Sequence, residues 1–143
     1  MYNIFKIVEY VIKYSTSNGI PVNAFRLQII LYFIQAEFMV SKKIPCFNDK
    51  IEAWDFMPTI PTVYRKYQGA MWSTLFPTNN MSVENEIATK DIKAINEIVD
   101  QCSHYSVATL AEITRNQTPW IKARNSVFKE ISLESLYEFF KEQ

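Results

Sequence analysis

Two carboxylates on either side of a tryptophan have types and a spacing that could carry out chemistry. Glu52 and Asp55 stand three residues apart and flank Trp54. A pair of carboxyl groups can act as acid and base on a glycosidic bond when a fold holds them at a suitable separation. Carboxylates beside a proline-rich loop more often accept hydrogen bonds from nearby backbone donors. We therefore favour a structural role for this pair.

The thiol and imidazole groups form no recognisable catalytic or metal-binding motif. His104 is the only histidine, Cys46 and Cys102 are the only cysteines, and neither CxxC nor HExxH occurs. Cys102 and His104 are two positions apart on a predicted helix, so their side chains point away from each other. We predict two buried free thiols, no metal or other cofactor, no small-molecule substrate and no enzymatic activity. An enzyme built on Glu52, Asp55 and a nearby Cys46 or His104 stays an alternative.

Residue types that anchor protein–protein contacts gather in one stretch. The segment IEAWDFMPTIPTVYRKY (51–67) contains one Trp, one Phe, two Tyr and two Pro. Aromatic residues and arginine are enriched in protein interfaces. Trp54, Tyr64 and Arg65 are therefore candidates for binding a partner, although Trp54, Tyr64 and Trp120 are also interpretable as core aromatics whose polar atoms find local partners.

The elements that must position these residues are helices. Apolar residues recur at helical spacing through most of the chain, and Asn23, Ser106 and Ser132 precede such stretches as N-caps. Pro61 is suited to the first position of a helix. The helices are expected at residues 1–14, 24–43, 61–67, 89–104 and 107–115, then from Pro119 and from 133 to 140. The polar segment 78–86 has no assigned structure.

These patterns predict the fold class. We expect an all-α, compact single-domain bundle of about six to eight short and medium helices, with a Pro-rich aromatic loop around Pro58 and Pro61. The 143 residues fit a single domain over 1–143, and 48% of them are hydrophobic. Residues 27–40 are the most apolar stretch, but they are too short to span a bilayer and are interrupted by polar side chains. We expect a cytoplasmic protein without a signal peptide.

Net charge argues against a general affinity for nucleic acid. The chain carries 15 basic and 15 acidic side chains, so its formal charge is zero, and no strong global field attracts polyanions. The N-terminal half has a small basic excess. A nucleic-acid-binding regulator stays an alternative that would use the basic residues of that half: Arg26, Lys42, Lys43, Lys50, Arg65 and Lys66.

The order of motifs resembles a known family. The segment LQIILYFIQAEFMVSKKIPCFNDKIEAWDFMPTIPTVYRKY resembles the signature of the Panacea domain, the SocA-like antitoxin family, and YSVATLAEITRNQTPW resembles its downstream motif. The resemblance covers roughly residues 23–140. It departs from the family pattern at Met57, where a glycine is usual, at Arg115, where a histidine is usual, and at Thr118.

The resemblance implies an antitoxin-like protein that neutralises a toxin by direct protein–protein binding and is encoded on a phage or other mobile element. The expected partner-binding residues are Trp54, Asp55, Tyr64, Arg65 and Arg115. The residues expected to support the motif are Glu52, Pro58, Pro61 and Trp120. Within the same family, alternatives are a phage accessory protein that inhibits a host defence system, and a proteolytic adaptor that delivers a toxin to ClpXP. The oligomeric state is not predicted.

Overall fold

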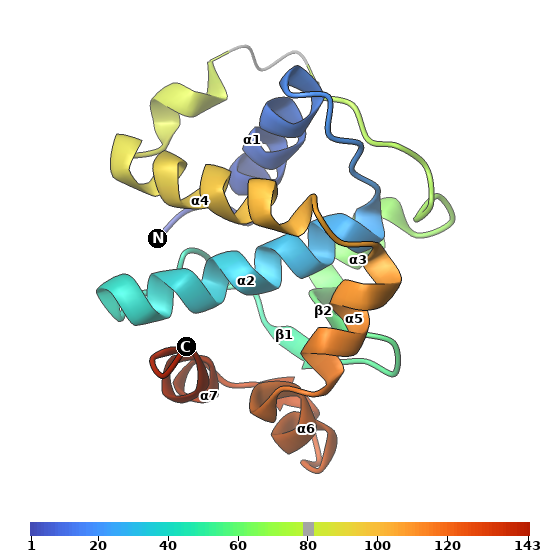
Figure 1. Ribbon diagram of the computed structural model, residues 1–143, viewed down its shortest axis with the longest axis vertical. Coiled ribbons are helices and arrows are strands. Elements are labelled where there is room, and N and C mark those ends of the chain that lie inside the picture. Colours follow the sequence, from blue (N-terminus) through green and yellow to red (C-terminus); the bar gives the residue numbers. More distant parts are fainter. Residues whose placement is uncertain (79–81) are drawn as a thin grey trace.

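The computed structural model describes residues 1–78 and 82–143 and is mostly helical (Figure 1). Its helices are α1 (Ile4–Ser17), α2 (Ala24–Lys42), α3 (Pro61–Tyr67), a 3₁₀ turn η1 (Val83–Glu86), α4 (Thr89–Cys102), α5 (Val107–Arg115), α6 (Thr118–Arg124) and α7 (Leu133–Phe140). The strands are β1 (Ile51–Ala53), β2 (Pro58–Thr59) and β3 (Glu130–Ile131).

Helix α2 forms the centre of the molecule (Figure 1). It is apolar around its whole circumference, and such a helix must be covered on most sides. Leu27, Ile30, Leu31 and Ile34 are fully buried. Helix α4 packs along one side of α2, and α7 packs along another. By length and composition alone α2 could also cross a membrane, but 61% of its apolar window is buried inside the molecule.

A small antiparallel sheet corrects the all-α prediction. Its strand order is β2-β1-β3, with Ala53 opposite Pro58 and Ile51 opposite Ile131. The strands have two or three residues each, too few to show the alternation that identifies a strand in sequence. In addition, β3 lies far along the chain from β1. Pro58 fits because β2 is at the edge of the sheet, where a missing N–H breaks no ladder bond.

The predicted helix starts are largely confirmed. Asn23, Ser106 and Ser132 each accept a backbone hydrogen bond from the first turn of α2, α5 and α7, and Pro61 is the first residue of α3. The predicted helix ends agree less well with the structure. Helix α1 continues to Ser17 and is ended by Gly19, whose φ of +67° suits glycine, and α4 ends at Cys102. Of the segment 78–86, residues 79–81 lie outside the described residues.

One ionic cluster joins the segment before α1, the end of α2 and the start of α4. The carboxylate of Asp91, in the first turn of α4, pairs with Lys42 at the end of α2 and accepts a 2.5 Å hydrogen bond from the Tyr2 hydroxyl. Asp91 is 4% exposed. Burial raises the pKa of this carboxyl, but the hydrogen bonds from Lys42 and Tyr2 outweigh it and hold the pKa below its usual value. The cluster therefore contributes stability mainly in its charged form.

Candidate functional site

A groove of about 650 Å³ lies against the loop between β1 and β2. We call it the aromatic groove. Its walls come from the β1–β2 segment, from α3, from the start of α2 and from the turn between α6 and β3. The residues that line it are Phe25, Glu52, Ala53, Trp54, Asp55, Phe56, Met57, Thr59, Tyr64, Met71, Arg124, Val127, Phe128 and Lys129.

Trp54 and Tyr64 form the aromatic centre of this groove. Their rings meet edge to face with centroids 4.9 Å apart, an arrangement that aromatic pairs favour. The indole N–H of Trp54 donates to Glu52 Oε1 at 2.8 Å. Glu52 thus fixes the ring of its neighbour, and both aromatic rings stay half-buried. This contact favours a structural role for the Glu52 carboxylate.

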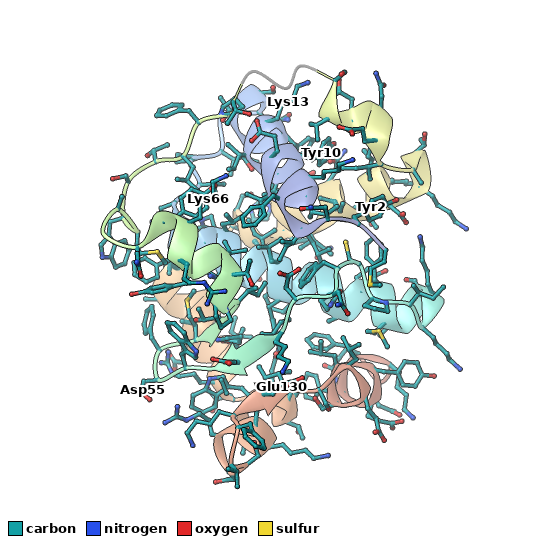
Figure 2. The ribbon with its side chains drawn as sticks, turned by 180° about the vertical axis from the view of Figure 1, so that it is seen from behind. Tyr2, Tyr10, Lys13, Asp55, Lys66 and Glu130 are labelled. Atoms are coloured by element: carbon teal, nitrogen blue, oxygen red, sulfur yellow. The ribbon has the colours of Figure 1, made fainter. Side chains whose placement is uncertain are left out.

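Arg124 holds the wall of the groove that the β1–β2 segment forms. Its Nη1 donates to the carbonyl of Ala53 at 2.9 Å, and its Nη2 lies 2.8 Å from Asp55 Oδ1. Its guanidinium also lies over the Trp120 ring, 5.5 Å from the centroid. The planar fork of arginine suits such simultaneous contacts. Asp55 remains 93% exposed despite this ion pair, and it stands at the edge of the molecule in Figure 2.

Two further contacts from the C-terminal half fix the same loop. The indole N–H of Trp120 donates to the carbonyl of Trp54 at 3.0 Å. Arg115 Nη1 donates to the carbonyl of Phe56 at 2.6 Å, and its guanidinium lies 5.6 Å from the Phe56 ring centroid. Helices α5 and α6 thus set the conformation of the β1–β2 loop through its backbone oxygens.

The rim of the groove exposes large apolar side chains. Phe128 is 84% exposed, Val127 is 89% exposed and Phe56 is 42% exposed. Trp72, 69% exposed, does not line the groove but lies beside it, packed on the groove-lining Phe25 with the ring planes tilted by 50° and the centroids 4.4 Å apart. Apolar side chains gathered around a groove mark a surface where another molecule binds.

Two buried glutamines of α2 hold the backbone that leads into and out of the sheet. Gln28 exchanges two hydrogen bonds with Ile60: its Oε1 accepts from the N–H at 2.7 Å and its Nε2 donates to the carbonyl at 3.1 Å. Gln35 accepts from the N–H of Cys46 at 2.7 Å and donates to the carbonyl of Phe47 at 2.8 Å. The two glutamines stand seven residues apart, so they lie on one face of the helix.

The predicted residues are distributed unevenly around this site. Trp54, Asp55 and Tyr64 line the aromatic groove, whereas Arg65 and Arg115 do not. Arg65 is exposed on α3 and Arg115 is half-buried. Of the motif-supporting residues, Glu52 and Trp120 bond to Trp54. Pro58 pairs with β1 and Pro61 starts α3.

Sequence reasoning missed Arg124, Trp72 and Phe128. Arg124 lies four residues after Trp120 and therefore on the same face of α6, which was an available signal. The exposure of Trp72 and Phe128 has no sequence signature, because apolar residues in loops are often buried.

The candidate chemical groups do not converge. Cys46 and Cys102 are free and buried as predicted, and burial raises the pKa of the Cys46 thiol to about 12 and that of Cys102 to about 11. Such thiols are poor nucleophiles. Neither Cys46 nor His104 lines the aromatic groove beside Glu52 and Asp55. Within residues 1–78 and 82–143, no group of three His, Cys, Asp or Glu side chains is placed to hold a metal ion.

The comparisons with known proteins identify the family. The family model "Antitoxin SocA-like, Panacea domain" matches residues 27–121, which is more than half of the chain. The protein therefore belongs to the SocA-like Panacea domain family, as its motifs predicted. The matched segment contains α2, the first two strands, α3 and the start of α6. It therefore includes Trp54, Tyr64 and Trp120.

One curated relative is similar over a shorter segment. Antitoxin SocA of Caulobacter vibrioides (strain NA1000 / CB15N) is 46% identical over 46 residues, which are 32% of this chain and 24% of that protein. No solved structure matches the chain.

Proposed function

We propose that this protein is an antitoxin that neutralises a toxin by direct binding, with the aromatic groove as its docking surface. The observation that carries this proposal is the combination of exposed apolar side chains at the rim with a rigid hydrogen-bonded loop beneath them. Phe128 and Val127, which line the groove, are 84% and 89% exposed. A surface that is already ordered loses little conformational entropy on binding.

The proposed contact residues fall into two groups. Trp54, Asp55 and Tyr64 contact the toxin from the groove, and Arg65 contacts it from the exposed side of α3. Arg115 contributes at the edge, where its guanidinium packs on the exposed Phe56 ring. Residues 1–143 act as a single cytoplasmic Panacea-like domain, and the gene lies beside that of its toxin on a phage or other mobile element.

Three of the six basic residues of the nucleic-acid alternative make contacts within the molecule. Lys42 pairs with the buried Asp91, and Lys66 lies over the Phe5 and Tyr67 rings. The guanidinium of Arg26 donates to two backbone carbonyls at the end of α4. These contacts favour a protein partner over DNA or RNA.

The test is co-expression with the adjacent gene in bacteria. The adjacent gene is expressed alone, with the wild-type protein, and with the double variant Tyr64→Ala/Arg65→Ala. We expect toxicity that the wild type relieves, together with a stoichiometric complex in a pull-down. The double variant should relieve toxicity less while its circular dichroism melt stays close to that of the wild type.

Other outcomes of this experiment would favour one of the alternative functions. Rescue in which the toxin disappears, and returns when ClpXP is absent, would establish a proteolytic adaptor. A harmless neighbour that forms no complex would contradict the antitoxin proposal and favour an inhibitor of a host defence system. Collapse of the melt in the double variant would show that the half-buried Tyr64 supports the fold rather than the contact with the toxin.

A further inference from the structure

We propose that a second groove, on the face of α2 between α4 and α7, binds an amphipathic helix with basic flanks from another protein. We call it the helical groove. It has a volume of about 440 Å³ and is separate in its lining residues from the aromatic groove. Figure 1 shows α2 running between α4 and α7, with α5 at one end. The inference does not depend on the proposed antitoxin function.

The floor of the helical groove is one stripe of α2. Phe33, Ala36, Glu37 and Val40 line it, and these positions follow the i, i+3, i+4, i+7 spacing of a single helix face. Most of α2 is covered by the rest of the molecule, whereas Phe33, Glu37 and Val40 on this stripe stay only half-buried. An apolar helix with one face incompletely covered can accept a further packing element.

The walls determine the shape of the occupant. Ile98 of α4, Ile113 of α5 and Phe140 of α7 line the sides, and Ile113 is 39% exposed. Because the floor and most of the walls are helical, their side chains form ridges into which the ridges of another helix can pack. An incoming helix would complete the bundle around α2, with its apolar face inserted between α4 and α7.

The charge of the helical groove indicates which residues stand beside the apolar face of the partner helix. Glu37 is the only Asp, Glu, Lys or Arg that lines the helical groove. Its Oε1 accepts a hydrogen bond from the Ser41 hydroxyl at 2.8 Å, and no ion pair to it occurs within residues 1–78 and 82–143. A purely apolar occupant would desolvate this carboxylate without compensation. A Lys or Arg beside the apolar face of the partner helix would pair with it.

The test uses three synthetic fluorescent peptides of about 18 residues, a common length for a surface helix. The first carries leucines at i, i+3, i+4, i+7 spacing with lysines elsewhere, the second has the same leucines with glutamates, and the third is a scrambled lysine peptide. Binding to the full chain is measured by fluorescence anisotropy. We expect the lysine peptide to bind roughly tenfold more tightly than the other two, as one interfacial charge pair with a packed face permits.

Two charge-reversal variants distinguish an effect of the helical groove on peptide binding from an effect of the protein's net charge. Glu37→Lys should lose the preference for the lysine peptide, whereas Glu130→Lys should keep it. Glu130 is exposed on β3 and does not line the helical groove. Its substitution therefore changes the net charge by the same amount as Glu37→Lys without altering the groove. If Glu37→Lys does not fold, Ile113→Lys on the exposed wall should weaken binding of the lysine peptide instead. Equal binding of all three peptides, or an equal effect of the two reversals, would overturn the proposal.

Discussion

Arg124 is the residue on which the contacts behind the aromatic groove converge. It binds the Ala53 carbonyl and the Asp55 carboxylate and packs on the Trp120 ring. A lysine at this position would keep the charge but would lack the planar fork that makes these contacts together. Arg124 therefore links α6 to the loop that carries the proposed binding residues.

Arg124→Lys should lower the free energy of unfolding by about 1–2 kcal/mol, because hydrogen bonds to a charged group are lost in a partly exposed site. Urea unfolding followed by circular dichroism measures this change. The matched control is Lys122→Arg, on an exposed position of the same helix, which should shift stability by no more than about 0.5 kcal/mol. Equal effects of the two substitutions would show that Arg124 does not hold the loop.

Gln28→Leu should be among the more destabilising substitutions in α2. The leucine would leave the N–H and carbonyl of Ile60 without the partners they now have, and each unsatisfied buried group costs about 1–3 kcal/mol. Gln101→Leu, on an exposed position of α4, makes the same chemical change where water is available. An equal decrease of the unfolding midpoint in both variants would refute the bridging role of Gln28.

At the residue level, the residue types identify the β1–β2 loop as a candidate site but do not identify the side chains that bond to it. Trp54, Tyr64 and Trp120 stand out by type and by motif, and the structure places the first two in one groove. The role of Gln28 was not predicted, although a polar residue in an otherwise apolar helix is a signal that it meets backbone groups. Arg115 and Arg124 act on carbonyls of a distant loop, and sequence spacing alone does not show such long-range contacts.

At the element level, helices were predictable and the sheet was not. Helices α1 and α4 each have a repeating apolar face, and α2 is apolar throughout and capped by Asn23, so the existence of these helices follows from nearby residues. The sheet depends on pairing of β1 with a two-residue strand at Glu130 and Ile131, and α3, η1, α4, α5 and α6 intervene between them in the chain. Pairing over that distance is decided by tertiary packing, because segments this short have weak intrinsic preference.

The packing of the N-terminal segment, α2 and α4 should depend on pH through Asp91. The pKa of this carboxyl is lowered in the folded state, so its contribution to stability is present above the ordinary value near 3.8 and is lost as pH falls through the lower folded pKa. Asp91→Asn should therefore be less stable than the wild type at pH 7, by about 2 kcal/mol. The difference should shrink below pH 3.8.

Urea unfolding of both proteins at neutral and at strongly acidic pH measures that dependence. The control is Asp49→Asn, in the connector before β1, because Asp49 forms no ion pair within residues 1–78 and 82–143. A wild-type advantage over Asp91→Asn that stays constant down to acidic pH would contradict the ionic account of the cluster.

At the scale of the whole molecule, a rigid framework lies beneath two incompletely covered surfaces. The aromatic groove is built on the sheet, and the helical groove is built on α2. Substitutions of exposed side chains at or beside the rim of a groove should affect binding far more than folding. Trp72→Ser should leave the free energy of unfolding within about 0.5 kcal/mol of the wild type while weakening the toxin complex. A stability loss of several kcal/mol would instead show that Trp72 completes the core.

The dissociation constant of the purified complex tests the central claim most directly. It is measured by titration calorimetry for the wild type, for Phe128→Ser at the groove rim, and for Ile44→Ser, an exposed apolar residue that does not line the groove. We predict that Phe128→Ser weakens binding by about tenfold or more, as expected for an anchoring aromatic residue, and that Ile44→Ser leaves it unchanged. Wild-type affinity for Phe128→Ser, or an equal loss for Ile44→Ser, would contradict docking at the aromatic groove.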